Sequence, residues 1–288
     1  MRLMITDSGL GGLSVCAQLE MAVTSPADDL EIMFVNANPH ADGGYNSLPS
    51  QTHRIEMFDR FLRGSFDQYK PDRIAIACNT LSVIYHETTF SKSCPIPVDG
   101  IVDAAVSVSN SHLATHPEQG LIIFATETTT EAGTYPRLIN SDQIVSQACP
   151  DLASAITRDA SGQDSQDLLR IYADEALKSF QRLPEEVGVL LACTHYPYQS
   201  GSFDQVLRSR GVIPHILDPN TLMTDQLIQQ LHLEGDAPGS VRFRFVSRFP
   251  IPEEEVASLS VYLEDEAPLT LQALQHQEIN PDLFAPKR

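Results

Sequence analysis

Positive charge is scarce in this 288-residue sequence. Its 19 lysines and arginines stand against 38 aspartates and glutamates, which gives a formal charge of −19. Nucleic acids and anionic membrane surfaces are polyanions, so we expect neither as a partner. The same imbalance means that an anionic substrate must be held by local dipoles, against the field of the whole protein.

Long apolar runs and clustered cysteines are also absent. No segment approaches the length of a membrane span, and the first acid, Asp7, comes too early for a signal peptide. The five cysteines are odd in number and lack Cys-x-x-Cys spacing, which argues against a disulfide framework or a zinc site and favours a reducing cytoplasm. Since 42% of the residues are hydrophobic, the chain can form one or two globular domains.

Two short apolar segments each end in a cysteine that is followed by polar residues. Val189 to Ala192 lead into Cys193-Thr194-His195, and Ile74 to Ala77 lead into Cys78-Asn79-Thr80. Proteins with parallel sheets place chemistry at the carboxyl ends of their strands. A free cysteine is commonly a small buried hydrophobe, but packing alone does not explain polar residues after both cysteines. The sequence therefore predicts a thiol site with one cysteine in each of two similar halves.

A glycine-rich segment follows the first predicted strand, Leu3 to Thr6. It reads Asp7-Ser8-Gly9-Leu10-Gly11-Gly12 and precedes a helix from about Leu13. Such a turn directs backbone N–H groups at an anion, although a tight turn without a ligand remains an alternative. The dinucleotide fingerprint fails because Ser14 replaces its third glycine, and no Gly-Lys-Ser/Thr of a P-loop is present.

Strands that alternate with helices predict an α/β protein with a parallel sheet in each of two similar domains. The breaker cluster from Ser93 to Val98 marks a crossing between them. We expect a discontinuous first domain of residues 1–97 and 212–275, a second domain of residues 98–211, and a poorly ordered tail of residues 276–288. Residues 161–181 predict one amphipathic helix, and residues 241–246 alternate like an edge strand.

In order along nearly its whole length, the chain resembles glutamate racemases of the aspartate/glutamate racemase superfamily. The matching segments are residues 7–13, Ala77-Cys78-Asn79-Thr80, Ala125-Thr126 with Thr129 and Tyr135, and residues 193–197. The resemblance implies an active site in the cleft between two α/β domains. It also implies a cytoplasmic, cofactor-independent and commonly dimeric enzyme that makes D-glutamate for the cell wall.

The resemblance implies the following roles by match. Cys78 and Cys193 would be the two catalytic acid/bases, supported by Asp7 and His195. Hydroxyl and amide groups would hold the amino acid: Ser8, Asn79, Thr80, Thr126, Thr129 and Thr194. Inversion through a planar carbanion needs a base on one face and an acid on the other, which two thiols supply. Strand-end N–H groups, a helix N-terminus or a protonated His195 would lower the thiol pKa values. No lysine stands in these motifs, which agrees with a reaction without a Schiff base.

Three positions depart from the family's pattern. The second strand ends in Asn36 where the family has an acid, and the family's second-domain Glu falls near Thr157 or Arg158. Its Pro-Tyr-Gly, which helps to receive the distal carboxylate, falls on Ala41-Asp42-Gly43. A carboxylate at Asp42 would repel a second substrate carboxylate by about 1 to 4 kcal/mol. We therefore assign Asp42 and Gly43 to the substrate site while leaving the side chain of the substrate open.

Several functions remain alternatives to a glutamate racemase. Another amino-acid racemase, or a decarboxylase or isomerase on the same fold, would use the same cysteine segments. A non-enzymatic descendant that binds a partner would not need them, and a Cys-His hydrolase would leave Cys78 unexplained. We expect a small amino acid as the substrate, no cofactor or metal, and a homodimer.

Overall fold

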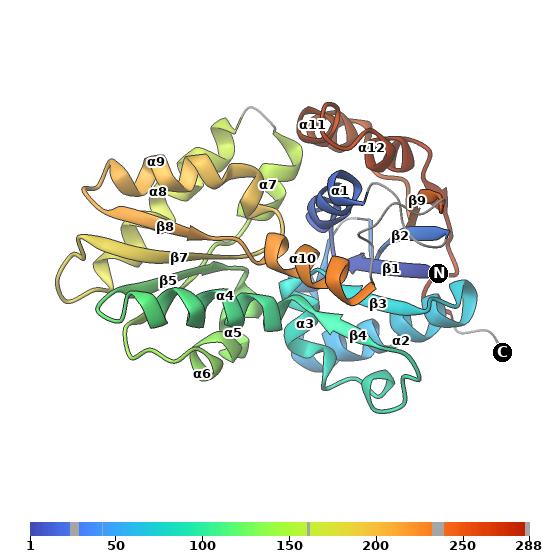
Figure 1. Cartoon of the computed structure of the whole chain (residues 1–288), viewed down its shortest axis with the longest axis horizontal. Helices are drawn as coiled ribbons and strands as arrows, with labels where there is room; N and C mark the ends of the chain where they lie inside the picture. The colour runs from blue at the N-terminus through green and yellow to red at the C-terminus, as the bar shows by residue number, and fades with distance from the viewer. Residues whose placement is uncertain (24–28, 42, 160–161, 232–238, 286–288) are drawn as a thin grey trace.

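The computed structural model describes residues 1–23, 29–41, 43–159, 162–231 and 239–285. Its strands form two sheets, both fully parallel, that lie side by side (Figure 1). The first sheet has six strands in the order β10-β9-β2-β1-β3-β4. Their bounds are β1 Arg2–Asp7, β2 Leu30–Asn36, β3 Arg73–Ile76, β4 Val98–Gly100, β9 Val241–Ser247 and β10 Glu278–Ile279. Every residue of β2 is buried, as expected of a strand covered on both faces.

The second sheet has four strands in the order β6-β5-β7-β8. Their bounds are β5 Gly120–Ala125, β6 Ile144–Ala148, β7 Glu186–Ala192 and β8 Ile213–Leu217. The register places Ala125 beside both Ala148 and Ala192, so β5, β6 and β7 end together. The residue that follows each strand therefore opens onto the same edge of the sheet.

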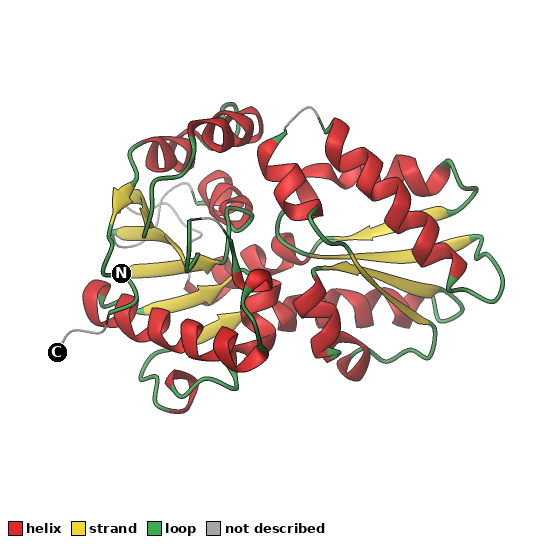
Figure 2. Cartoon of the chain, turned by 180° about the vertical axis from the view of Figure 1, so that it is seen from behind, coloured by secondary structure: helices red, strands yellow, loops and turns green. Residues whose placement is uncertain are grey.

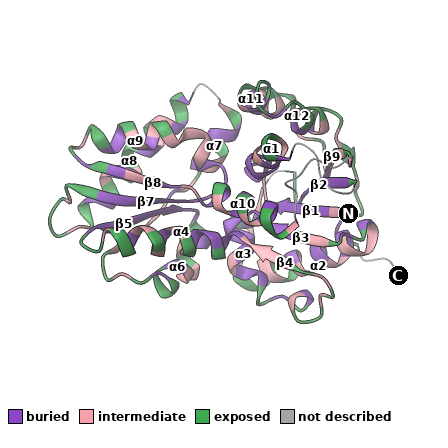
Figure 3. Cartoon of the chain, in the orientation of Figure 1, coloured by how far each residue is buried: buried purple, intermediate pink, exposed green. Residues whose placement is uncertain are grey.

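Helices cover both faces of each sheet (Figure 2). On the first sheet, one face carries α2 (Gln51–Tyr69) and α3 (Asn79–Tyr85), and the other carries α1 (Leu13–Ala22), α10 (Pro219–Leu231), α11 (Glu253–Leu263) and α12 (Pro268–Gln275). On the second sheet, one face carries α7 (Leu152–Arg158), α8 (Gln163–Lys178) and α9 (Ser200–Arg208), and the other carries α4 (Ile101–Thr115), α5 (Glu127–Ala132) and α6 (Thr134–Leu138). Short 3-10 turns occur at Tyr45–Ser47, Phe90–Lys92 and Tyr196–Gln199. The central strands β1, β2, β5 and β7 are the most deeply buried, whereas β4 and β6 are half-buried and β10 is exposed (Figure 3).

The prediction of two parallel α/β sheets is confirmed, but strands at the expected boundaries lie elsewhere. β4, which begins at Val98, pairs with β3 in the first sheet, and α4 then carries the chain to the second sheet. β8, which we expected in the first domain, pairs with β7 in the second sheet, and α10 carries the chain back. The predicted helix over residues 161–181 is confirmed as the single helix α8, Gln163–Lys178, which begins after Gly162 at φ +76°. Ser161 lies outside the described residues.

Two expectations about the C-terminal part were wrong. β9 is not an edge strand, because β2 pairs along one side of it and β10 pairs with Val246 and Ser247 on the other. The tail is not poorly ordered as far as residue 285, because Leu283 and Phe284 are buried in the core beside α2.

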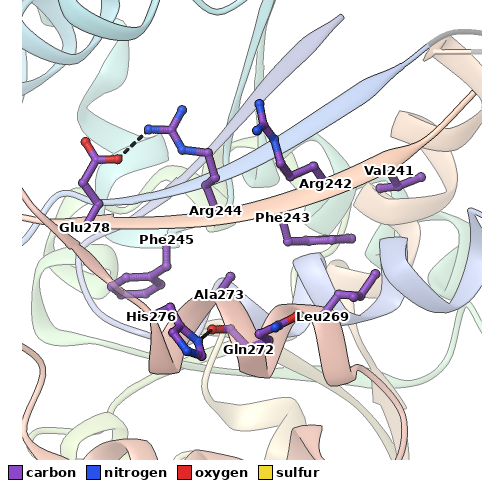
Figure 4. A pocket seen from close by; sticks show the side chains of 10 residues that line it. All are labelled: Val241, Arg242, Phe243, Arg244, Phe245, Leu269, Gln272, Ala273, His276 and Glu278. Carbon is purple, nitrogen blue, oxygen red and sulfur yellow. Dashed lines mark hydrogen bonds and ion pairs between the residues drawn. The ribbon is translucent and has the colours of Figure 1, made fainter.

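A groove of about 320 Å³ lies between β9 and α12, next to β10. Its wall includes Phe243, and Arg244 pairs with Glu278 at its edge (Figure 4). No described helix combines the length and apolarity needed to cross a bilayer.

Candidate active site

The carboxyl ends of the two sheets face each other and enclose a cavity of about 620 Å³. Its wall includes ten of the predicted site residues: Asp7, Ser8, Gly43, Cys78, Asn79, Thr80, Thr126, Cys193, Thr194 and His195. They follow β1 and β3 of the first sheet and β5 and β7 of the second, apart from Gly43, which belongs to the loop after β2. The structure therefore brings together residues that are as much as 188 positions apart, from Asp7 to His195.

Cys78 lies between the end of β3 and the first residue of α3, and is 5% exposed. Its Sγ is 3.1 Å from the Ser8 Oγ, and either atom can donate the hydrogen bond. Burial raises the pKa of the Cys78 thiol to about 12, and the negative charge of Asp7 adds to this effect, while hydrogen bonds from Ser8 and the backbone oppose it. We expected the surroundings to lower the thiol pKa, but removal from water outweighs the hydrogen bonds.

Cys193 follows β7 of the second sheet, lines the same cavity and is 6% exposed. Its Sγ is 3.6 Å from the Nδ1 of His195. Burial raises the pKa of Cys193 well above the ordinary thiol value, and it lowers the pKa of His195, an effect that Asp7 opposes. His195 is therefore neutral near pH 7 and offers a lone pair for a proton, rather than the positive charge that we expected to lower the thiol pKa.

Asp7 links the two sheets. It is 1% exposed; its Oδ1 accepts from the Gly9 backbone N–H at 2.9 Å, and its Oδ2 accepts from the Thr194 hydroxyl at 2.6 Å. The Asn220 side chain of α10 donates to the Thr194 carbonyl at 3.2 Å. A buried carboxylate held at both oxygens orients the segment that carries Cys193 and His195.

The glycines after β1 allow this close approach. A Cβ on Gly11 would lie 2.4 Å from the Thr194 Oγ1 and 2.5 Å from the His195 Nδ1, and a Cβ on Gly9 would lie 3.2 Å from the His195 ring. The Gly9 N–H is used by Asp7, within the chain itself. The glycine-rich segment is thus explained by contact between the two halves of the protein, and no anion is needed to account for it.

Hydroxyl and amide groups meet at a second contact across the cavity. The Thr80 Oγ1 is 2.9 Å from the Thr126 Oγ1, and Thr129 lies behind this pair with its Oγ1 3.0 Å from that of Thr126. The Tyr135 hydroxyl donates to the Asn79 Oδ1. The Asn79 Nδ2 is buried and has no hydrogen-bond partner within the described part of the chain. A buried donor beside a cavity is costly unless a ligand or water accepts its hydrogen bond.

The departures from the family's pattern fall partly on the cavity. Asn36 ends β2 as expected and lines the cavity, where its Oδ1 accepts from the Asn38 N–H at 2.8 Å. Thr157 and Arg158 line it from α7. Gly43 lines it as well, and Asp42 lies outside the described residues.

Some lining residues were not among the predicted site residues. Tyr45 is 1% exposed and its hydroxyl has no described partner; burial raises the pKa of this hydroxyl well above its ordinary value, and the charge of Cys78 adds to this. Glu255 of α11 and a third thiol, Cys149, also line the cavity. Cys149 follows β6 as Cys193 follows β7, so its position after a strand could have identified it as a cavity residue from the sequence. Tyr45 and Glu255 lie in or beside segments without a motif, so the sequence did not indicate them. The described residues contain no group of three or more His, Cys, Asp or Glu side chains arranged to hold a metal ion.

Comparison with known proteins shows what the chain is similar to. No protein-family model matches the sequence. The chain is 29% identical over 236 residues to a glutamate racemase of Thermus thermophilus, and the match covers 80% of each chain. It is 26% identical over 241 residues to the glutamate racemase of Methylococcus capsulatus, and this match covers 80% of this chain and 79% of that protein.

Solved structures agree on the fold. The Francisella tularensis glutamate racemase, crystallised in complex with D-glutamate, superposes with a TM-score of 0.69 and 23% identity over 97% of each chain. A Bacillus anthracis glutamate racemase superposes with a TM-score of 0.69 and 17% identity over 92% of this chain and 94% of that one. The chain is thus similar to glutamate racemases over 80% of its length, and its two parallel sheets have the fold of solved glutamate racemase structures.

Proposed function

We propose that this amino-acid racemase interconverts L- and D-glutamate by proton transfer between two thiols. The observation that carries the proposal is the position of Cys78 and Cys193, which come from different sheets and line one cavity. A substrate held between them would present opposite faces of its α-carbon to the two sulfurs. One thiolate would remove the α-proton and the other thiol would return a proton to the opposite face.

Each thiol has a neighbour suited to proton movement. His195, neutral near pH 7, can take the proton of Cys193 across the 3.6 Å contact. The Ser8 hydroxyl can donate to the Cys78 thiolate at 3.1 Å. Because burial raises both thiol pKa values, both cysteines are protonated in the unliganded protein. An ammonium group that enters the cavity would favour a thiolate beside it, so binding would activate the base.

The α-carboxylate would bind where the hydroxyls of Thr80 and Thr126 meet. The free Asn79 Nδ2 hydrogen atoms point to the same function, because an unpaired buried donor is available for an anionic oxygen. Donors at this position would stabilise the negative charge that develops on the carboxylate when the α-proton leaves. No described residue of the cavity wall is a lysine, so no side chain there can form a Schiff base with a substrate. We accordingly propose that the reaction needs no cofactor.

The test is a chiral assay of the purified protein with each enantiomer of glutamate and aspartate. We expect racemisation of glutamate, and a loss of about 10²- to 10⁴-fold in kcat for Cys78→Ser and for Cys193→Ser, because serine is a far weaker acid. Cys94→Ser is the matched control, since Cys94 donates to the Ile96 carbonyl and does not line the cavity. Near wild-type racemisation by either active-site variant would exclude the two-thiol mechanism. Release of CO₂ in place of racemisation would assign the protein to the decarboxylases.

Three further points belong to the proposal. The D-glutamate formed would serve cell-wall synthesis, as the resemblance implies. All five cysteines are free thiols, which supports a reducing, cytoplasmic location. We also propose a homodimer, which light scattering of the purified protein would test.

A further inference from the structure

The wall of the cavity is strongly acidic, as is the whole protein. Among the described residues that line it are four carboxylates, Asp7, Glu127, Asp151 and Glu255. Arg158 is the one lysine or arginine among them. The formal charge of the whole protein is −19, so its overall field repels an anionic ligand. A positive side chain in the cavity wall is therefore a candidate group for binding one.

Arg158 occupies a defined place at the mouth of the cavity. It is the last residue of α7, and Thr157 before it is buried and also lines the cavity. Glu255 of α11 also lines the cavity, and α11 packs beside α7 (Figure 1). The positive charge of Arg158 acts on Glu255: burial raises the pKa of that carboxyl, Glu254 adds to the effect, and Arg158 opposes it.

Arg158 is also available for a ligand. Two other arginines of the second sheet's helices form ion pairs, Arg170 with Asp167 and Arg208 with Asp204. Arg158 forms no such ion pair with any described residue, and its side chain is exposed. An unpaired guanidinium beside a cavity is suited to a carboxylate, which it can bind through two parallel N–H donors.

An acidic amino acid needs such a group here. Its α-carboxylate would be met by Thr80, Thr126 and Asn79, which are all neutral. Its side-chain carboxylate would meet neutral groups such as Gly43 and the four carboxylates of the wall, and Arg158 is the one lysine or arginine among the described lining residues. We propose that Arg158 selects acidic substrates by pairing with their side-chain carboxylate. This inference rests on the proposed racemase function and adds the residue that discriminates between side chains.

The first measurement compares glutamate with glutamine, which has nearly the same shape and no side-chain charge. For Arg158→Gln we expect the KM for glutamate to rise about 5- to 30-fold while kcat changes less than about twofold, since a hydrogen-bonded charge pair at a partly exposed site is worth that much. The affinity for glutamine, measured by calorimetry, should stay the same. Arg158→Lys should recover part of the loss because it restores the charge without the two parallel donors.

Two further variants separate this role from a general effect of charge. Arg170→Gln removes the same charge from α8, outside the cavity, and should leave the KM for glutamate unchanged. Glu255→Gln removes one negative charge from the cavity wall and should lower the KM for glutamate. Melting temperatures check that each variant is folded.

The outcomes distinguish this inference from the proposed function. An unchanged preference for glutamate over glutamine in Arg158→Gln overturns the inference, even if the wild type is an active racemase. If the wild type racemises no amino acid, the proposed function fails, and calorimetry with D-glutamate and D-glutamine still tests Arg158. In that case, the inference is also overturned if the wild type binds D-glutamate and D-glutamine equally well, or if it binds neither of them.

Discussion

Gly11→Ala is the substitution that tests most directly how the two halves of the active site are held together. The new Cβ would lie 2.4 Å from the Thr194 Oγ1, 2.5 Å from the His195 Nδ1 and 2.7 Å from the His195 backbone N. Carbon atoms pack at about 3.5 to 4.0 Å, so the three contacts are short by about 1 Å. Because one of these atoms belongs to the backbone, a side-chain rotation alone cannot relieve the clash. The segment that carries Cys193 must move away from Asp7.

The expected result is a large loss of activity with a small loss of stability. Overpacking of this kind costs about 1 to 3 kcal/mol, which lowers the melting temperature of a protein of this size by about 2 to 10 °C. A displacement of about 1 Å at reacting groups costs roughly 100-fold in rate, and we expect a fall of that order in kcat/KM for racemisation. Gly201→Ala is the control, because no atom of the described residues lies within 4 Å of its added Cβ and alanine is favoured inside the helix α9. Wild-type kcat/KM in Gly11→Ala would refute the proposed role of the glycine segment.

Three further predictions concern other contacts. Thr194→Val leaves the Asp7 Oδ2 without its 2.6 Å donor and should lower the free energy of unfolding by about 1 to 3 kcal/mol in urea titrations, whereas Thr194→Ser should retain most of it. The Phe284 side chain is 3% exposed, and its ring centroid lies 5.4 Å from that of Phe61. Phe284→Ala should therefore lower the free energy of unfolding by about 3 kcal/mol, and an unchanged urea midpoint would mean that the C-terminal segment is not part of the core. Burial lowers the pKa of His112 below its usual 6.5, so the unfolded chain binds this proton more readily and stability falls as the pH drops below 6.5. The melting temperature of His112→Gln should depend less on pH than that of the wild type between pH 7 and 5, and parallel curves would contradict this assignment.

The sequence predicted the parts of the fold that leave a local pattern. Apolar strands that end in Cys78 and Cys193 predicted both parallel sheets, since buried strands are continuous apolar runs. The position of β9 was missed because Arg242 and Arg244 alternate with apolar residues as on an edge strand; both arginines pair with Glu31 of β2, which lets a charged strand lie inside the sheet.

Contacts between distant segments had no local signal. The hydrogen bond from Thr194 to Asp7 spans 187 residues, and the contact between Ser8 and Cys78 spans 70. Leu283 and Phe284 form an apolar pair too short for any periodicity, so their burial depends on α2 and could not be predicted from the tail alone. We expected the thiol pKa values to fall because the sequence shows hydrogen-bond donors next to each cysteine. It does not show how deeply each thiol is buried, and burial raises the pKa.

The discontinuous first sheet has a consequence for how the chain is made. β5 to β8 are contiguous in sequence, so the second sheet can form as soon as residue 217 has left the ribosome. The first sheet must wait, because β9 covers the edge of β2 and begins only at Val241. Until then β2, whose seven residues are all buried in the finished protein, presents an open apolar edge. Chains released early, before about residue 247, should therefore aggregate, and the nascent protein should depend on chaperones during the synthesis of its last quarter.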